Sequence, residues 1–392
     1  MEPLDRPLAD VARWLQERGG EAERDLAELV EINSFTDHKV GGDAVGARLD
    51  ALFDLPGIAR QHVPSTRYAD HRVYRTAPPG TRSAPIALIG HHDTVFPPGK
   101  FEGYRMDGAL RRGPGVLDMK GGLVVVAYAL RALEAVVGLH NVAPICVASV
   151  GDEEVGSPEG QGVLRNAVTG AASALVFEAG RSADAIVTRR KGTGGLTIRV
   201  TGRAAHAGAD HKSGVNALWA LAKFVDGAQK HTDYARGVTV NVGRIEGGIG
   251  KNTVPGDALA LVDIRFCSAT DGLALVAALT TLARTVEDEL PGATITLEGG
   301  ILRFPMEKTE ASAALFDRYV VAAGAAGLGT GESGLVGGGS DACTTAALGI
   351  ASIDGLGPRG RGFHTEDEQI EVASLLPKAE ALARFLLAET NR

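Results

Sequence analysis

The strongest constraint on the fold is a set of short, continuous apolar runs that alternate with helical patterns along the chain. Such runs are typical of parallel strands covered on both faces, because neither face then needs polar side chains. Each run is followed at once by a glycine or a glutamate. The runs are Ala84–Ile89, Ile145–Val150, Ala174–Phe177 and Ile350–Asp354. With helical spacing over Leu8–Ile32 and Met119–Val137, they predict an α/β domain with a central, mostly parallel sheet.

The middle of the chain has a different pattern and predicts a second unit. Between residues 194 and 300 apolar and polar residues alternate more regularly, as in strands with one exposed face. Two helical segments, Asn216–Gln229 and Gly272–Leu290, interrupt these strands. We therefore expect an α+β domain at 190–302, inserted into a larger domain formed by 1–189 and 303–392. A length of 392 residues accommodates two such domains.

Composition excludes several functional classes. The longest apolar stretch, Leu123–Leu130, is far shorter than the ~20 residues that cross a bilayer. The N-terminal segment is acidic and lacks the pattern of a secretory signal. Three widely spaced cysteines favour neither a disulfide framework nor a Cys-zinc site. A net charge of −8 without a Lys/Arg run disfavours nucleic acid as a partner. We expect a soluble cytoplasmic protein with no membrane partner.

Histidines and carboxylates follow the predicted strands. The carboxyl ends of parallel strands meet at one edge of a sheet, which is where ligands bind in α/β folds. Scattered surface charges do not have this distribution, although each residue by itself would more often be structural. The residues delivered to this edge are His91, Asp118, Glu153, Glu154, Glu178 and His364.

Two histidines and three carboxylates suffice to hold two divalent metal ions with one carboxylate shared. Two dications against Asp118, Glu154 and Glu178 leave a charge of +1, which a bridging hydroxide would neutralise. Zinc is expected, and the same donor set also accepts cobalt or manganese.

Two further carboxylates have expected roles beside these ligands. Glu153 is adjacent to the ligand Glu154, and a carboxylate beside a metal-bound water is a natural general base. Asp93, two residues after His91, is placed to orient that imidazole.

Seven segments, taken in order, resemble the M20 metallopeptidases, most closely their glutamate carboxypeptidase branch. The resemblance extends from about residue 85 to the C-terminus. The segments are GHHDTV, GPGVLDMKGG, GDEEVGS, FEAG, TGRAAHAG, GGGSDA and GFHTEDE. The resemblance implies a zinc-peptidase-like metal domain and an inserted lid domain that commonly forms a homodimer.

The resemblance also assigns roles within this site. His91 and Glu178 would hold one ion and Glu154 and His364 the other, with Asp118 bridging them. In the lid, His206 would stabilise the oxyanion, and Asn252 and Arg265 would bind the terminal carboxylate of the substrate. Arg303 is assigned to the same task, although Phe304 separates it from Pro305 where the family more usually has Arg-Pro. These residues are His91, Asp118, Glu154, Glu178, His364, His206, Asn252, Arg265 and Arg303.

The expected activity is metal-dependent amide hydrolysis that releases a C-terminal, glutamate-like amino acid from a peptidyl or N-acyl group. The alternative within this class is an N-acyl-amino-acid deacylase of the acetylornithine deacetylase or succinyl-diaminopimelate desuccinylase type. An alternative of another class is a non-catalytic paralogue that binds a metal or ligand. Near matches to a nucleophile elbow at Ser333 and to a P-loop at Lys251 each lack required residues.

Overall fold

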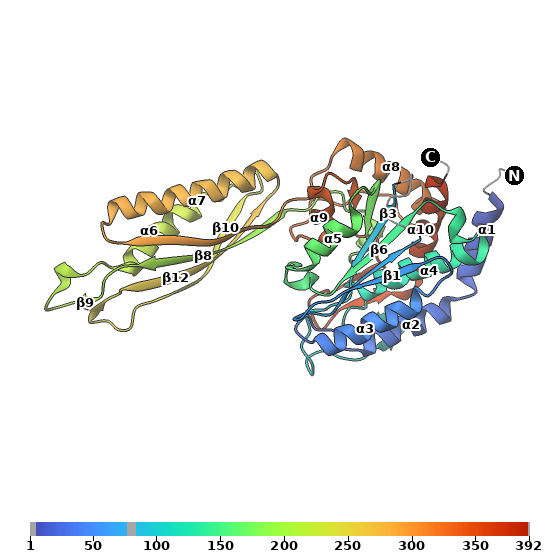
Figure 1. The fold of residues 1–392 in the computed structure, drawn as a ribbon, viewed down its shortest axis with the longest axis horizontal. Helices are drawn as coiled ribbons and strands as arrows, with labels where there is room; N and C mark the ends of the chain where they lie inside the picture. Colours follow the sequence, from blue (N-terminus) through green and yellow to red (C-terminus); the bar gives the residue numbers. More distant parts are fainter. Residues whose placement is uncertain (1–4, 77–83, 391–392) are drawn as a thin grey trace. The chain divides into compact units, whose positions relative to one another are not determined.

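The computed structural model describes residues 5–76 and 84–390, which fall into two compact units (Figure 1). The larger unit contains the chain up to Arg189 together with residues 308–335 and 340–392, and the smaller unit contains 190–307 and 336–339. Residues 1–4, 77–83 and 391–392 of the predicted larger domain lie outside the described residues.

The boundaries of the smaller unit differ from the predicted 190–302. Its first segment extends to Glu307, because the backbones of Arg190 and Met306 exchange two hydrogen bonds of 3.0 and 3.1 Å. The short piece 336–339 also belongs to it, since the carbonyl of Val336 accepts a hydrogen bond from the N–H of Lys191 at 2.9 Å. Neither contact has a signature in the local sequence.

The larger unit is built on a sheet in the order β1-β2-β6-β3-β7-β14. The pairs β6–β3, β3–β7 and β7–β14 are parallel, whereas β1 and β2 add an antiparallel edge. The strands are β1 (Ala59–Val63), β2 (His71–Arg75), β3 (Ile86–His91), β6 (Ile145–Val150), β7 (Ser173–Val176) and β14 (Ser352–Ile353). All residues of β3, β6, β7 and β14 are buried, as expected for a sheet covered on both faces.

Helices cover both faces of this sheet (Figure 1). On one face α4 packs against β3, and α1, α2 and α10 pack against α4; on the other face α5 and α9 contact the strands. The helices are α1 (Asp5–Gln16), α2 (Gly19–Glu31), α3 (Lys39–Leu52), α4 (Lys120–Val136), α5 (Gly160–Val168), α8 (Glu310–Ala325), α9 (Asp341–Ala347) and α10 (Leu375–Glu389). A Cβ on Gly122 would lie 2.0 Å from the carbonyl oxygen of Phe177, so glycine is required where α4 begins against the sheet.

The single helix predicted over Leu8–Ile32 is wrong, because the chain forms two helices there. Arg18 leaves the helical conformation (φ −115°, ψ 18°) immediately before Gly19 and Gly20. Glycine loses the most conformational freedom in a helix, so this pair is a favourable point for a break. Both resulting helices pack against α4.

A small second sheet of the larger unit has the order β15-β16-β5-β4. Its strands are β4 (Arg105–Asp107), β5 (Leu110–Arg112), β15 (Gly360–Arg361) and β16 (Gln369–Glu371). The strands β15 and β16 pair with each other antiparallel, so they hold the two ends of the loop that contains His364.

The smaller unit has the element order β8-α6-β10-β12-α7-β13 and an antiparallel sheet in the order β10-β12-β8-β13, as in ferredoxin-like folds. Both helices pack on one face of this sheet around a core of their own (Figure 1). The elements are β8 (Gly192–Thr201), α6 (Ala217–Gln229), β10 (Thr239–Gly247), β12 (Asp257–Phe266), α7 (Ala269–Glu289) and β13 (Thr294–Arg303). A two-stranded ribbon pairs β9 (Ala205–His206) with β11 (Thr253–Val254).

Within residues 5–76 and 84–390, no helix has both the length and the apolar character needed to cross a membrane.

Candidate metal centre

The fold brings the residues predicted at the strand ends together at one edge of the main sheet. His91 is the last residue of β3, and Glu178 lies two residues beyond the end of β7. Glu153 and Glu154 begin a short 3-10 turn, Glu153–Val155, just after β6. Asp118 precedes α4, and His364 lies between β15 and β16.

Asp118 lies between the two histidines. Its Oδ1 is 3.3 Å from Nε2 of His91, and its Oδ2 is 3.3 Å from Nε2 of His364. A carboxylate whose two oxygens face two different imidazoles has the arrangement needed to bridge two ions.

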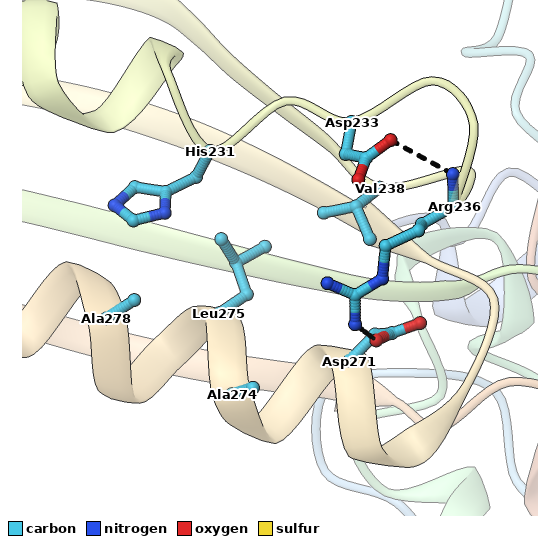
Figure 2. A pocket seen from close by; sticks show the side chains of 8 residues that line it. All are labelled: His231, Asp233, Arg236, Val238, Asp271, Ala274, Leu275 and Ala278. Carbon is cyan, nitrogen blue, oxygen red and sulfur yellow. Dashed lines mark hydrogen bonds and ion pairs between the residues drawn. The ribbon is translucent and has the colours of Figure 1, made fainter.

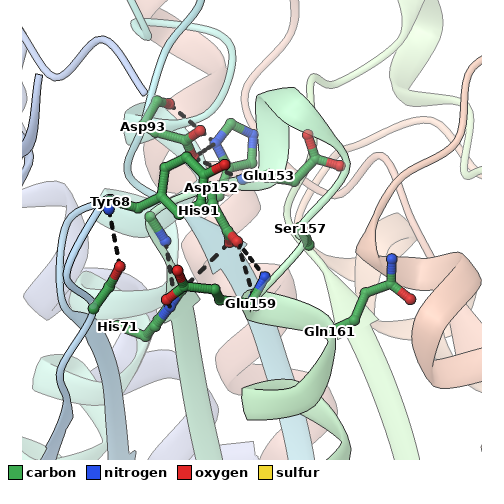
Figure 3. Close-up of polar contacts among 12 residues, drawn as sticks. Tyr68, His71, His91, Asp93, Asp152, Glu153, Ser157, Glu159 and Gln161 are labelled. Carbon is green, nitrogen blue, oxygen red and sulfur yellow. Dashed lines mark hydrogen bonds and ion pairs between the residues drawn. The ribbon is translucent and has the colours of Figure 1, made fainter. Parts of the chain in front are cut away.

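Each histidine also faces a second carboxylate. Nε2 of His91 is 3.9 Å from Oε1 of Glu178, and Nε2 of His364 is 3.0 Å from Oε2 of Glu154. Donor atoms of His91, Glu153 and Glu178 lie within 4.8 Å of one another, as do those of His91, Asp118 and Glu154. Figure 3 shows the side chains of Glu153 and His91 near each other. The residues of the cluster are therefore arranged in two sets that share His91.

Burial and close contacts shift the pKa values of the ionisable groups in this cluster. Burial and the nearby charge of Asp118 raise the pKa of Glu154 to about 8 and also raise the pKa of Glu178. Hydrogen bonds with Asp118 and Glu154 raise the pKa of His364 to about 10. Burial lowers the pKa of His91, but its contacts with Asp118 and with Asp93 outweigh burial and leave that pKa well above the ordinary value. Buried carboxylates this close to one another need a counter-charge.

The donor set fits a pair of divalent cations. It offers imidazole nitrogens and carboxylate oxygens, which zinc accepts readily, as do cobalt and manganese. The side chains of His91, Asp118, Glu154 and Glu178 expose at most 9% of their surface, whereas that of His364 is half exposed. The cluster is thus buried on most sides and accessible beside His364, as a site with an open coordination position requires.

Asp93 contacts both His91 and the turn that carries Glu153 and Glu154; Figure 3 shows it beside His91 and Glu153. Its Oδ1 is 3.3 Å from Nδ1 of His91 and accepts the backbone N–H of Glu153 at 3.1 Å. Its Oδ2 accepts the N–H of Glu154 at 3.2 Å and the hydroxyl of Thr36 at 2.8 Å. The side chain of Asp93 therefore orients one imidazole and holds the turn that carries two glutamates.

Glu368 supports the loop that carries Asp118, and sequence reasoning missed it. The buried carboxylate accepts backbone N–H groups from Gly115, Leu117 and Asp118 at 3.2, 2.9 and 3.0 Å. Burial outweighs these donors and raises the pKa of Glu368 to about 8. The available signal was its place in the HTEDE segment, four residues after His364.

His364 itself has a backbone conformation that is uncommon outside glycine, with φ 62°. Residues held in this region cluster at functional sites, because the surrounding structure must enforce them. Here the β15–β16 pairing on either side of the loop supplies that constraint.

The four remaining predicted residues all belong to the smaller unit. His206 is exposed on the β9–β11 ribbon, and its Nδ1 accepts the N–H groups of Gly208 and Ala209 at 3.1 and 3.0 Å. Asn252 is exposed just before β11. Arg265 on β12 donates two hydrogen bonds to Asp263 at 2.8 and 2.7 Å. Arg303, at the end of β13, is buried.

The smaller unit also contains a cavity of about 170 Å³ between α7 and the segment that joins α6 to β10 (Figure 2). Arg236 reaches across it to Asp271, and its backbone N–H donates to Asp233 at 3.1 Å. The charges that line this cavity are thus largely paired with one another, unlike those of the buried cluster in the larger unit.

Comparison with known proteins assigns the chain to a family. Residues 87–388 match the model of peptidase family M20/M25/M40. Carboxypeptidase G2 of Pseudomonas sp. (strain RS-16) is 28% identical over 93% of this chain and 88% of its own length. A tripeptidase of Staphylococcus aureus (TM-score 0.78, 20% identity) covers 95% of this chain and 99% of its own. An M20 metallo-carboxypeptidase, Sso-CP2, of Sulfolobus solfataricus (TM-score 0.72, 15% identity) covers 95% of this chain and 100% of its own. The chain therefore belongs to peptidase family M20/M25/M40 and is a hydrolase of amide bonds.

Proposed function

We propose that the chain is a metal-dependent carboxypeptidase that releases a C-terminal acidic amino acid, such as glutamate, from a peptidyl or N-acyl group. The single observation that carries the proposal is the position of Asp118 between His91 and His364, with one further carboxylate beside each histidine. Family membership and the carboxypeptidase relative support the reaction.

The residues divide into two ligand sets that share Asp118. His91 and Glu178 would hold one ion, and Glu154 and His364 the other. Zinc is the proposed metal, with cobalt or manganese as substitutes. When bound, the ions supply Lewis-acid polarisation of the scissile carbonyl and a lower pKa for the attacking water.

Glu153 is the proposed general base. Its backbone N–H is fixed by Asp93, and its carboxylate lies within the group that contains His91 and Glu178. Glu153 would take the proton of the attacking water and then pass it to the leaving amine nitrogen, so that no net proton is consumed in the step. His206 is the proposed donor to the oxyanion: its Nδ1 accepts two backbone N–H groups, which leaves the ring proton on Nε2.

The acidic specificity is proposed from the smaller unit. The planar guanidinium of Arg265 already binds one carboxylate with two parallel hydrogen bonds, and a substrate carboxylate has the same geometry. Asn252 and Arg303 complete the proposed substrate site. We also propose that the protein forms a homodimer through the smaller unit and that it is cytoplasmic. Sedimentation at several protein concentrations tests the homodimer.

The test of the base is Glu153→Gln. It should lower kcat by about 10²- to 10⁴-fold while the metal content stays at the wild-type value. Glu366→Gln, an exposed glutamate near His364, is the control and should keep both. Wild-type activity in Glu153→Gln would remove Glu153 from this role.

The test of the substrate class is a panel of N-acyl amino acids and dipeptides with acidic, basic and apolar C-terminal residues. Preference for a C-terminal glutamate supports the carboxypeptidase proposal. Preference for acetylornithine or succinyl-diaminopimelate would instead establish the deacylase alternative. Activity that chelation leaves unchanged would overturn the metal-dependent reaction altogether.

A further inference from the structure

We propose that His71 is a positioning residue that fixes the start of the loop carrying Glu153 and Glu154. His71 is the first residue of β2, on the antiparallel edge of the main sheet, and its side chain is 1% exposed. The inference rests on the proposed roles of the two glutamates and adds a residue that acts on them through the backbone.

The contact that carries the inference joins His71 to Gly151. Nδ1 of His71 accepts the backbone N–H of Gly151 at 3.2 Å (Figure 3). Because Nδ1 is the acceptor, the neutral ring carries its proton on Nε2, which lies 3.9 Å from Oε2 of Glu159. Gly151 is buried and directly follows β6, so its N–H has little access to water as an alternative partner.

The other end of the loop is fixed by Asp152. This residue is fully buried, and its Oδ2 accepts the N–H groups of Glu159 and Gly160 at 2.8 and 3.0 Å, where α5 begins. Its carbonyl accepts the N–H of Ser157 at 2.9 Å. A Cβ on Gly160 would lie 2.4 Å from Oδ1 of Asp152, so this approach requires glycine.

The middle of the loop is held by Asp93, which accepts the N–H groups of Glu153 and Glu154. The loop is therefore anchored at its start by His71, in its middle by Asp93 and at its end by Asp152. Without the imidazole acceptor, the N–H of Gly151 would be buried and unpaired, which favours a shift of the loop start. Because Glu153 follows two residues later, such a shift would displace the proposed base, and small misplacements of catalytic groups are costly.

Two substitutions of His71 by amide side chains distinguish a hydrogen-bonding role of Nδ1 from a role in packing alone. In His71→Asn the side-chain oxygen can take the place of Nδ1, whereas in His71→Gln the amide lies where Nε2 was. We expect His71→Gln to lower kcat by about 10- to 100-fold with KM changed less than about two-fold, and His71→Asn to restore most of kcat. His62→Asn is the control, because His62 lies on the neighbouring strand, is half exposed and pairs with Asp50.

The decisive result is which of the two variants has the higher kcat. Both are measured with saturating metal, and the metal content is determined on the same samples. A kcat that is retained in His71→Asn and lost in His71→Gln supports the proposal. Equal kcat in the two variants, whether high or low, or a higher kcat in Gln, overturns it.

A second measurement does not depend on turnover. Hydrogen exchange at the Gly151 amide should be accelerated in His71→Gln and close to wild type in His71→Asn. Equal exchange in the two variants would contradict the proposal even if kcat differed. If the wild-type protein releases no C-terminal amino acid while the exchange result holds, the proposed function fails and the His71 contact stands.

Discussion

Oδ1 of Asp93 accepts a hydrogen bond of 3.1 Å from the backbone N–H of Glu153. The same carboxylate lies 3.3 Å from Nδ1 of the proposed ligand His91. One side chain thus sets the position of the proposed base relative to a proposed ligand. Changes around Asp93 are therefore expected to affect catalysis as well as stability.

The hydroxyl of Thr36 is the first such change to test. It donates to Oδ2 of Asp93 at 2.8 Å, and both residues are buried. Thr36→Val keeps the shape and removes the donor, so we expect the free energy of unfolding to fall by about 1.5–3 kcal/mol and kcat to fall with it. Urea unfolding and steady-state kinetics measure the two effects. Thr36→Ser keeps the hydroxyl and is the control; equal losses in Val and Ser would show that the hydrogen bond is not responsible.

Glu368 offers a second change that does not touch the proposed ligand side chains. Its Oε1 accepts the N–H groups of Leu117 and Asp118, and its Oε2 accepts that of Gly115. In Glu368→Gln an amide nitrogen must face one of these donors, so at pH 9, above the pKa of about 8 of this carboxyl group, we expect a loss of about 1–3 kcal/mol in stability and weaker metal binding. Thermal unfolding with and without added metal measures both. Glu371→Gln is the control, because Glu371 is exposed and lies three residues later, at the end of β16. Unchanged metal affinity in Glu368→Gln would contradict the expected support of Asp118.

The main sheet and the meeting of His91, Asp118, Glu154, Glu178 and His364 at its edge were largely predictable, because both follow from one local signal; metal binding by these residues stays a prediction. The four predicted runs consist mostly of apolar residues, which indicates buried strands. Parallel strands place the residues that follow them at the same edge of the sheet. The predicted run at Ala84–Ile89 differs from the observed β3, which begins two residues later and includes His91. The proposed ligand His91 is thus part of the strand rather than of the loop after it.

The contact of Asp93 with His91 was predicted, but the contacts of His71 and Glu368 could not be, because each joins segments far apart in the chain. The strand β2 reads HRVYR, and its buried Arg72 and Tyr74 are satisfied by Asp50 of α3, so its sequence does not look like that of a covered strand. His71 lies in that strand, 80 residues from Gly151 along the chain. No local pattern connects them.

Arg265 tests the substrate site of the smaller unit. Because it is bound to Asp263 by two hydrogen bonds, a substrate carboxylate would have to compete for it. Arg265→Lys cannot form the paired bonds, so we expect KM for an N-acyl glutamate to rise by about ten-fold with kcat little changed. Asp263→Asn should leave KM equal or lower, since the competing charge is gone. An unchanged KM in Arg265→Lys would exclude Arg265 from carboxylate binding.

Metal binding should release protons and strengthen as pH rises. In the metal-free protein the pKa of His364 is about 10 and that of Glu154 about 8, both above their ordinary values, so at pH 7 both groups carry protons. A metal ion binds the neutral imidazole and the carboxylate, and it must displace these protons. Both groups belong to the ligand set of one ion, so binding of that ion displaces two protons, and its apparent affinity rises about 100-fold per pH unit below the lower of these pKa values. Titration calorimetry of the chelated protein in two buffers of different ionisation enthalpy, between pH 6 and 8, measures the release. His364→Gln should bind one ion fewer and release fewer protons. An affinity that does not change with pH would show that these side chains are not the ligands.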